Sequence, residues 1–223
     1  PYVVATSMLF NMILMQAIRD LPALTKSADT FRNHSSEQGY PFFVSTATAG
    51  LGSAKVKNGQ HQEGIELIKQ GVAGFRLTGA RLSVSYYLHL LAEAHLFCGD
   101  QSAGLEVVDE AIELTNTLLD DLFAPELYRL KGELLLLSDN NTEAAEKCFQ
   151  QSLDLARQNN AKMFELRTAM SRVRLHREMN GENYHSAIAR LSDVFGRFTE
   201  GHSIADLQDA KSLLDEAVQP ELS

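Results

Sequence analysis

The chain has 223 residues, of which 44% are hydrophobic and 22% charged, as in ordinary folded proteins with a continuous core. Its 29 acidic and 20 basic side chains give a net charge of -9, which argues against nonspecific binding to nucleic acid or to anionic lipid. The two cysteines, Cys98 and Cys148, have no CxxC spacing, so we expect a reducing, cytoplasmic compartment.

The N-terminal stretch, Tyr2 to Arg19, is predicted to be an apolar helix, with Pro22 to Glu37 as its more polar partner. Polar residues interrupt it too often for a bilayer span, so we expect a buried helix and no membrane role. Only the following hairpin can cover its apolar edge, so this edge is expected to pack on a preceding part of a longer protein or on a second copy, as a homodimer. The residues of this apolar edge are Tyr2, Val3, Met8, Leu9, Met12, Ile13 and Met15.

A helical hairpin is clearest over Glu126 to Gln158. Its two halves each carry one apolar stripe at helical spacing, and a turn at residues 138–141 separates them. Asn141 or Thr142 is expected to cap the second helix, because a short side-chain oxygen can accept a hydrogen bond from an unpaired backbone N–H. The stripes are Leu127, Leu130, Leu134 and Leu137, then Ala145, Phe149, Ser152, Leu153 and Ala156.

Turn residues recur along the chain with a period near 40. Gly59, Gly99, Asn140 and Asn180 are separated by 40, 41 and 40 residues, and a second series of turns lies half a period away, at residues 39–41, 78–79, 119–121 and 159–160. Two interleaved series indicate two helices per repeat, as in helical solenoids. The predicted hairpins span about 1–38, 42–78, 82–119, 124–159 and 162–198, and a last helix at 203–218 is expected to cap the array.

The second helix of each repeat carries small residues that would let neighbouring helices approach closely, beside one bulky apolar anchor. The anchors are Ile68, Val108, Phe149 and Leu191. The segment GLGSAK from Gly50 to Lys55 is the nearest approach to a phosphate loop, but it lacks the P-loop spacing and no predicted strand precedes it. We therefore interpret Gly52 as a close-packing residue of a first helix, equivalent to Ala92 and Gly132.

The repeat length is closer to that of armadillo and HEAT units, whereas the residues fit the tetratricopeptide (TPR) pattern with substitutions and without its tryptophan. We predict an all-α, TPR-like superhelix that forms a single domain over residues 1–223. The segments GQHQEGIELIKQGVAGFRLTGA, ELYRLKGELLL and FTEGHSIADLQDAKSLLDE resemble the C-terminal TPR-like region of large bacterial signalling proteins. In those proteins the region follows adenylate or guanylate cyclase domains, or a kinase domain, and a P-loop ATPase module.

In a TPR-like superhelix the first helices line the concave surface, so their polar residues are candidates for binding. The basic C-terminal end of this surface would suit an acidic peptide or a carboxylate, because guanidinium groups make forked contacts with carboxylates. The alternative, a solvated helix face, stays open because exposed charges on helices are common. The candidates are Ser53, Lys57, Tyr86, His89, Glu93, Glu126, Arg129, Glu133, Arg167, Arg174 and Arg177, with Arg172 nearby.

The predicted function is a non-catalytic interaction or regulatory module that binds a protein partner or the upstream domains of its own polypeptide. The alternative is a small-molecule sensor, for which Tyr86, Tyr87 and Phe97 would have to line an enclosed pocket. We expect no enzyme activity, cofactor or metal, because the seven histidines form no HExxH motif and no nucleophile set follows from the spacing.

Overall fold

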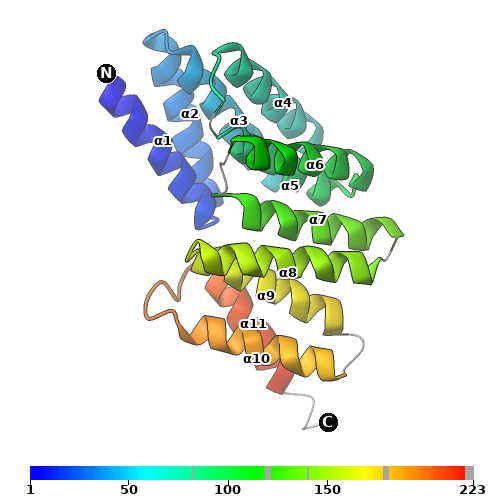
Figure 1. Cartoon of the computed structure of the whole chain (residues 1–223). Coiled ribbons are helices and arrows are strands. Elements are labelled where there is room, and N and C mark those ends of the chain that lie inside the picture. Colours follow the sequence, from blue (N-terminus) through cyan, green and yellow to red (C-terminus); the bar gives the residue numbers. More distant parts are fainter. Residues whose placement is uncertain (82, 119–121, 140, 178–180, 219–223) are drawn as a thin grey trace. The chain divides into compact units, whose positions relative to one another are not determined.

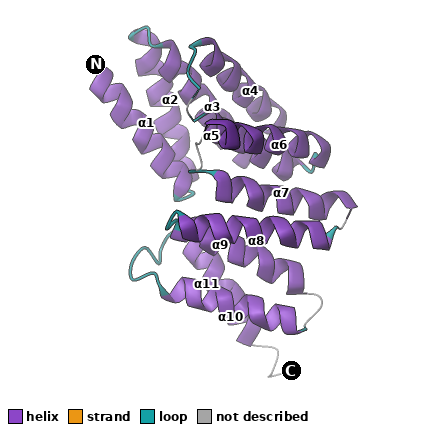
Figure 2. Ribbon diagram, viewed as in Figure 1, coloured by secondary structure: helices purple, strands orange, loops and turns teal. Residues whose placement is uncertain are grey.

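The computed structural model describes residues 1–81, 83–118, 122–139, 141–177 and 181–218 (Figure 1). Within these ranges all regular structure is helical, with eleven α-helices and no strand (Figure 2). This confirms the predicted all-α class. The helices are α1 (Tyr2–Ala17), α2 (Leu21–Glu37), α3 (Pro41–Lys57), α4 (His61–Leu77), α5 (Val84–Cys98), α6 (Gln101–Leu118), α7 (Ala124–Asp139), α8 (Thr142–Gln158), α9 (Lys162–His176), α10 (Glu182–Gly196) and α11 (Ala205–Val218).

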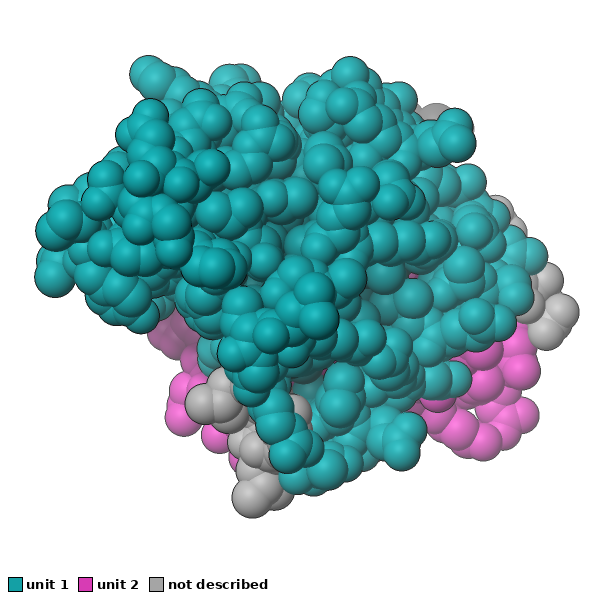
Figure 3. Space-filling model, turned by 90° about the horizontal axis from the view of Figure 1, so that it is seen from above, with its two compact units in different colours: residues 1–123 teal, residues 124–223 magenta. Residues whose placement is uncertain are grey.

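The chain divides into two compact units, residues 1–123 (unit 1) and residues 124–223 (unit 2), which Figure 3 colours separately. Unit 1 contains α1 to α6, and unit 2 contains α7 to α11. Within each unit consecutive helices pack against each other, as a helical repeat requires. The single repeat domain over residues 1–223 stays a prediction.

The helices end where the sequence places turn residues. Gly59 and Gly99 have φ angles of 82° and 69°, a left-handed conformation that glycine adopts without a steric penalty from Cβ. Asn141 caps α8, because its Oδ1 accepts a hydrogen bond from the backbone N–H of Ala144 at 3.1 Å. The predicted turns at 119–121, Asn140 and Asn180 lie outside the described residues.

In unit 1, α3 and α4 approach so closely that glycines are required at their contact. A Cβ on Gly52 would lie 2.6 Å from the carbonyl oxygen of Gly64, and a Cβ on Gly64 would lie 2.6 Å from the carbonyl oxygen of Gly52. This confirms Gly52 as a close-packing residue. The segment from Gly50 to Lys55 lies inside α3 and forms no phosphate-binding loop.

In unit 2, α7 and α8 pack through apolar stripes, and α11 covers α9 and α10. The four predicted anchors of the second helices, two in each unit, are fully buried. Leu137 differs from the prediction, because 52% of it is exposed although it continues the α7 stripe in the sequence. Leu207, Ala210 and Leu213 of α11 join the core formed with α9 and α10, which agrees with the predicted cap helix.

Candidate functional site

Three predicted concave-surface residues, Tyr86, His89 and Glu93, lie on α5 in unit 1. Tyr86 and His89 are buried, with 4% and 7% exposure, and the Tyr86 hydroxyl donates a hydrogen bond to Oε1 of Gln16 at 2.9 Å. His89 Nδ1 lies 2.6 Å from the backbone carbonyl oxygen of Tyr86, and its ring stacks on Phe123. Burial, with a smaller contribution from Tyr87, raises the pKa of Tyr86 far above its usual value.

These side chains therefore belong to the core that joins α1 to α5, and their hydrogen bonds hold that core together. Tyr87 is buried as well, with its hydroxyl 2.9 Å from Oγ1 of Thr46. Burial raises the pKa of Tyr87 to about 12. Phe97 is 56% exposed, so the three aromatic residues of the sensor hypothesis do not line one enclosed pocket.

The polar residues predicted on α7 and α9 form a network of ion pairs within unit 2. Arg129 donates to both carboxylate oxygens of Glu126, at 3.0 and 2.6 Å, and to Oε1 of Glu133 at 3.0 Å. Arg167 donates to Oδ2 of Asp206 on α11 through two nitrogens, at 2.9 and 2.6 Å. Burial alone would lower the pKa of Arg167, but the carboxylates of Glu126 and Asp206 outweigh it and raise the pKa.

The other predicted basic residues differ in their surroundings. Arg177 is exposed and lies 2.8 Å from Oε2 of Glu216. Arg172 pairs with Glu146. Arg174 is exposed, and the described part of the chain holds no ion pair for it. An acidic ligand at this end of the surface would have to compete with Asp206 and Glu216, so the arrangement gives the acidic-peptide hypothesis little support.

A shallow cleft of about 1070 Å³ lies between the α3–α4 turn and the α5–α6 turn of unit 1. His61 Nδ1 lies 3.2 Å from Sγ of Cys98, and His95 Nδ1 lies 3.3 Å from Oδ2 of Asp100. Burial and the Asp100 carboxylate raise the pKa of Cys98, while burial lowers the pKa of His95, so both groups are neutral near pH 7. No three His, Cys, Asp or Glu side chains among the described residues are placed to hold a metal ion.

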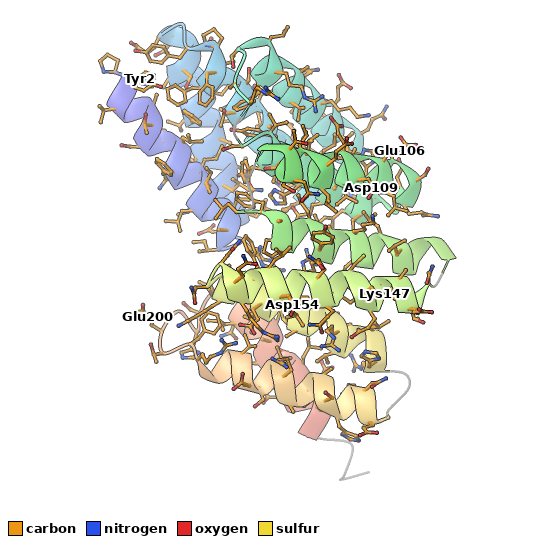
Figure 4. The ribbon with its side chains drawn as sticks, in the orientation of Figure 1. Tyr2, Glu106, Asp109, Lys147, Asp154 and Glu200 are labelled. Carbon is orange, nitrogen blue, oxygen red and sulfur yellow. The ribbon has the colours of Figure 1, made fainter. Side chains whose placement is uncertain are left out.

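The outer face of α1 is the most unusual surface of unit 1. Val3, Val4, Phe10 and Leu14 are 77%, 47%, 64% and 52% exposed, and α1 contains no charged residue. Figure 4 shows the side chains of this helix, with Tyr2 labelled at its N-terminal end. An open groove of about 690 Å³ follows its length between α1 and α2. We call these four residues, with Ser7, Asn11 and Ala17, the α1 outer face.

The polar side chains of α1 already have hydrogen-bond partners within unit 1. When a partner displaces water from a surface, polar groups that rely on that water lose their hydrogen bonds. Polar groups that are bonded within the protein keep theirs, so the free-energy cost of desolvation is smaller. The bonds run from Thr6 Oγ1 to the Tyr2 carbonyl (3.1 Å), from Ser7 Oγ to the Val3 carbonyl (3.0 Å), from Ser27 Oγ to Asn11 Oδ1 (2.8 Å) and from Tyr86 hydroxyl to Gln16 Oε1 (2.9 Å).

The predicted apolar edge coincides only in part with the α1 outer face. Tyr2 and Val3 are exposed as expected, whereas Met12 is fully buried against α2 and α3, and Met8, Leu9, Ile13 and Met15 are half-buried. The analysis of the sequence missed Val4, Phe10 and Leu14. Apolar residues surround this helix on all sides, so periodicity alone could not separate its inner face from its outer face.

No protein-family model matches the chain, and a search of curated proteins finds no match either. No described helix is long and apolar enough to cross a membrane. The fold defines an all-helical protein in which consecutive helices pack against each other within each unit.

Proposed function

We propose that this chain is a non-catalytic protein-interaction module with a TPR-like repeat fold, and that the α1 outer face is its binding surface. The observation that carries the proposal is that five of the nine large exposed hydrophobic side chains in the described residues belong to α1. Contiguous apolar surface of this kind usually marks an interaction site. The other four, Leu77, Phe97, Leu122 and Leu137, lie singly on separate elements.

The repeat supports a helix as the ligand of this surface. Later first helices pack against the second helix that precedes them, α3 on α2, α5 on α4 and α9 on α8. The outer face of α1 corresponds to the side of those helices that is covered by the preceding helix. We therefore infer that α1 accepts an apolar face of another helix, from a protein partner or from a cytoplasmic cyclase or kinase–ATPase parent of the kind the sequence resembles.

Binding of a hydrophobic fluorescent dye tests the proposal at a protein concentration low enough to keep the chain monomeric. The wild-type chain should enhance the fluorescence, and Leu14→Glu should remove much of the signal because it places a charge within the apolar surface. Leu77→Glu is the matched control, since Leu77 is 89% exposed on α4. A chain that binds no dye, or that loses the signal equally with either substitution, would contradict the proposal.

A further inference from the structure

We propose that the occupant of the α1 outer face is α1 of a second copy of this chain, packed antiparallel about a twofold axis near Phe10 and Asn11. The inference rests on the proposed function, because it names the partner of the same surface. It rests further on the spacing of the exposed residues of α1, on the absence of charged residues from this helix, and on the polarity of α11, the last helix of the chain.

The exposed residues of α1 have the spacing of a helix-packing seam. Val3, Ser7, Phe10, Leu14 and Ala17 follow one another at intervals of four, three, four and three residues, and all five are exposed. This is the heptad spacing that lets the side chains of one helix insert between those of another at a small crossing angle. The face therefore fits a helix of comparable length better than it fits an extended peptide.

The helix that fits is a second α1. Pairing of α1 with α11, the last helix of the chain, would bring α1 against exposed residues that are polar, among them Gln208, Lys211, Asp215 and Glu216. Such a contact would remove charged groups from water without giving them partners. Because no other helix in the described residues has several large exposed hydrophobic residues, the surface that best matches α1 is α1 itself. Two identical surfaces meet through a twofold axis.

Side-chain size favours the antiparallel orientation. In a parallel pair identical positions face each other, so Phe10 would meet Phe10 and Ser7 would meet Ser7. In an antiparallel pair centred between Phe10 and Asn11, Ser7 faces Leu14, Val4 faces Ala17 and Phe10 faces Asn11, so in these pairs the larger side chain meets a smaller one. Alternation of large and small residues lets two helices pack without voids.

Electrostatics and size set the expected strength of the dimer. The helix has 16 residues and is about 24 Å long, which gives a contact at the small end of specific interfaces and an affinity in the micromolar range. Each copy carries a net charge of -9, so salt weakens the repulsion between the two copies. Because α1 has no charged residue, the seam contains no ion pair that salt could weaken. Dimerisation should therefore strengthen as the salt concentration rises.

Sedimentation equilibrium of the full chain over a range of protein and salt concentrations tests the dimer. The wild-type chain should be a monomer–dimer mixture, and Leu14→Glu should raise the dissociation constant about 100-fold or more, because the variant buries unpaired like charges in an apolar seam. Leu77→Glu should leave the dissociation constant unchanged. Circular dichroism should show that both variants keep the wild-type fold, since both leucines are exposed. A chain that remains monomeric at several hundred micromolar would overturn the proposal.

Cysteine cross-linking tests the orientation, in a background in which Cys98 and Cys148 are replaced by serine. Asn11→Cys places two thiols beside the proposed twofold axis, whereas Val3→Cys places them about 22 Å apart along the seam. Mild oxidation should cross-link the Asn11→Cys chain and leave the Val3→Cys chain monomeric on a denaturing gel. Cross-linking of both would show a parallel pair, and cross-linking of neither would show that the dimer does not use α1.

The dye experiment separates failure of this inference from failure of the proposed function. If α1 forms the dimer, dye fluorescence per molecule should fall as the wild-type chain is concentrated, because the second copy covers the dye site. Dye binding by a chain that never dimerises would refute the second copy and leave α1 as a site for another protein. Absence of dye binding at low concentration would refute both.

Discussion

The ring of Phe149 on α8 lies directly against the α-carbon of Gly132 on α7. A Cβ at position 132 would lie 2.5 Å from Cε1 of Phe149, closer than two carbon atoms can approach without displacement. The contact pairs an anchor of a second helix with a small residue of a first helix in the same repeat. It therefore explains why this repeat needs glycine at this point of α7.

The first prediction concerns Gly132. Gly132→Ala should reduce the free energy of unfolding by about 1 to 3 kcal/mol, because the added methyl group forces the Phe149 ring or the helix to move. Urea unfolding measures the loss. Gly196 in α10 provides the control, since a Cβ there meets nothing within 4 Å. Gly196→Ala should be neutral or stabilise by up to about 1 kcal/mol, and an equal loss at both glycines would show that close packing is not the cause.

The second prediction concerns Phe149 itself. Phe149→Ala should cost about 3 to 5 kcal/mol, because the side chain is fully buried and its removal leaves a cavity between α7 and α8. The same substitution at Phe97, which is 56% exposed, should cost less than about 1 kcal/mol. A loss below about 1 kcal/mol for Phe149→Ala in urea unfolding would mean that the anchor assignment is wrong.

The core of the repeats could be predicted because it depends on local periodicity. Small residues and anchors at fixed spacing identified Gly52, Gly132 and Phe149 as contact residues, and the turn glycines identified the helix ends. These features are set by residues a few positions apart in the sequence. The predicted hairpin over about 124–159 likewise agrees with α7, which begins at Ala124, and with α8, which ends at Gln158.

The candidate site was harder to predict because it depends on contacts between distant residues. The sequence placed Arg167 on a polar helix face but could not show that Asp206, 39 residues later, pairs with it. Likewise, Tyr86 was predicted on an open surface, whereas its hydroxyl bonds to Gln16, 70 residues earlier, inside the core. Polar residues on a helix identify a face, but only the fold shows whether another helix covers it.

The third prediction concerns the ion pair between Arg167 and Asp206. Asp206→Ala should cost about 3 kcal/mol or more, because it leaves a largely buried guanidinium without its closest carboxylate. Since this pair joins α9 to α11, limited proteolysis should also cut the loop at residues 197–204 faster in the variant. Arg174→Ala provides the contrast. Arg174 is exposed, so its loss should change stability by less than about 0.5 kcal/mol.

If Asp206→Ala costs no more than Arg174→Ala, the buried pair contributes no more to stability than an exposed side chain. The basic end of the surface would then be available to an acidic ligand, as the sequence alone suggested. A binding assay with a poly-glutamate peptide would measure this, with affinity falling as salt rises.

The last prediction concerns the pH dependence of stability through Glu165 on α9. The Glu165 carboxylate accepts hydrogen bonds from Nε of Arg157 at 2.9 Å and from Nη2 of Arg197 at 2.5 Å. Burial tends to raise the pKa of Glu165, but the two arginines outweigh burial and lower the pKa below its ordinary value of about 4.5. The folded chain therefore holds this proton less tightly than the unfolded chain does.

The sign of the effect follows from this difference in proton binding. The stabilisation is fully present above the ordinary pKa of glutamate and is lost as the pH falls through the lower pKa of the folded state. Glu165→Gln should cost about 1 to 3 kcal/mol at pH 7, because it leaves both arginines without a charged acceptor. The difference in the free energy of unfolding between Glu165→Gln and the wild-type chain should shrink as urea unfolding is repeated from pH 5 down to pH 3. Glu143→Gln, at an exposed pair with Lys147, should change stability little at any pH. A Glu165→Gln penalty that does not diminish between pH 5 and pH 3 would show that the contribution of Glu165 is not electrostatic.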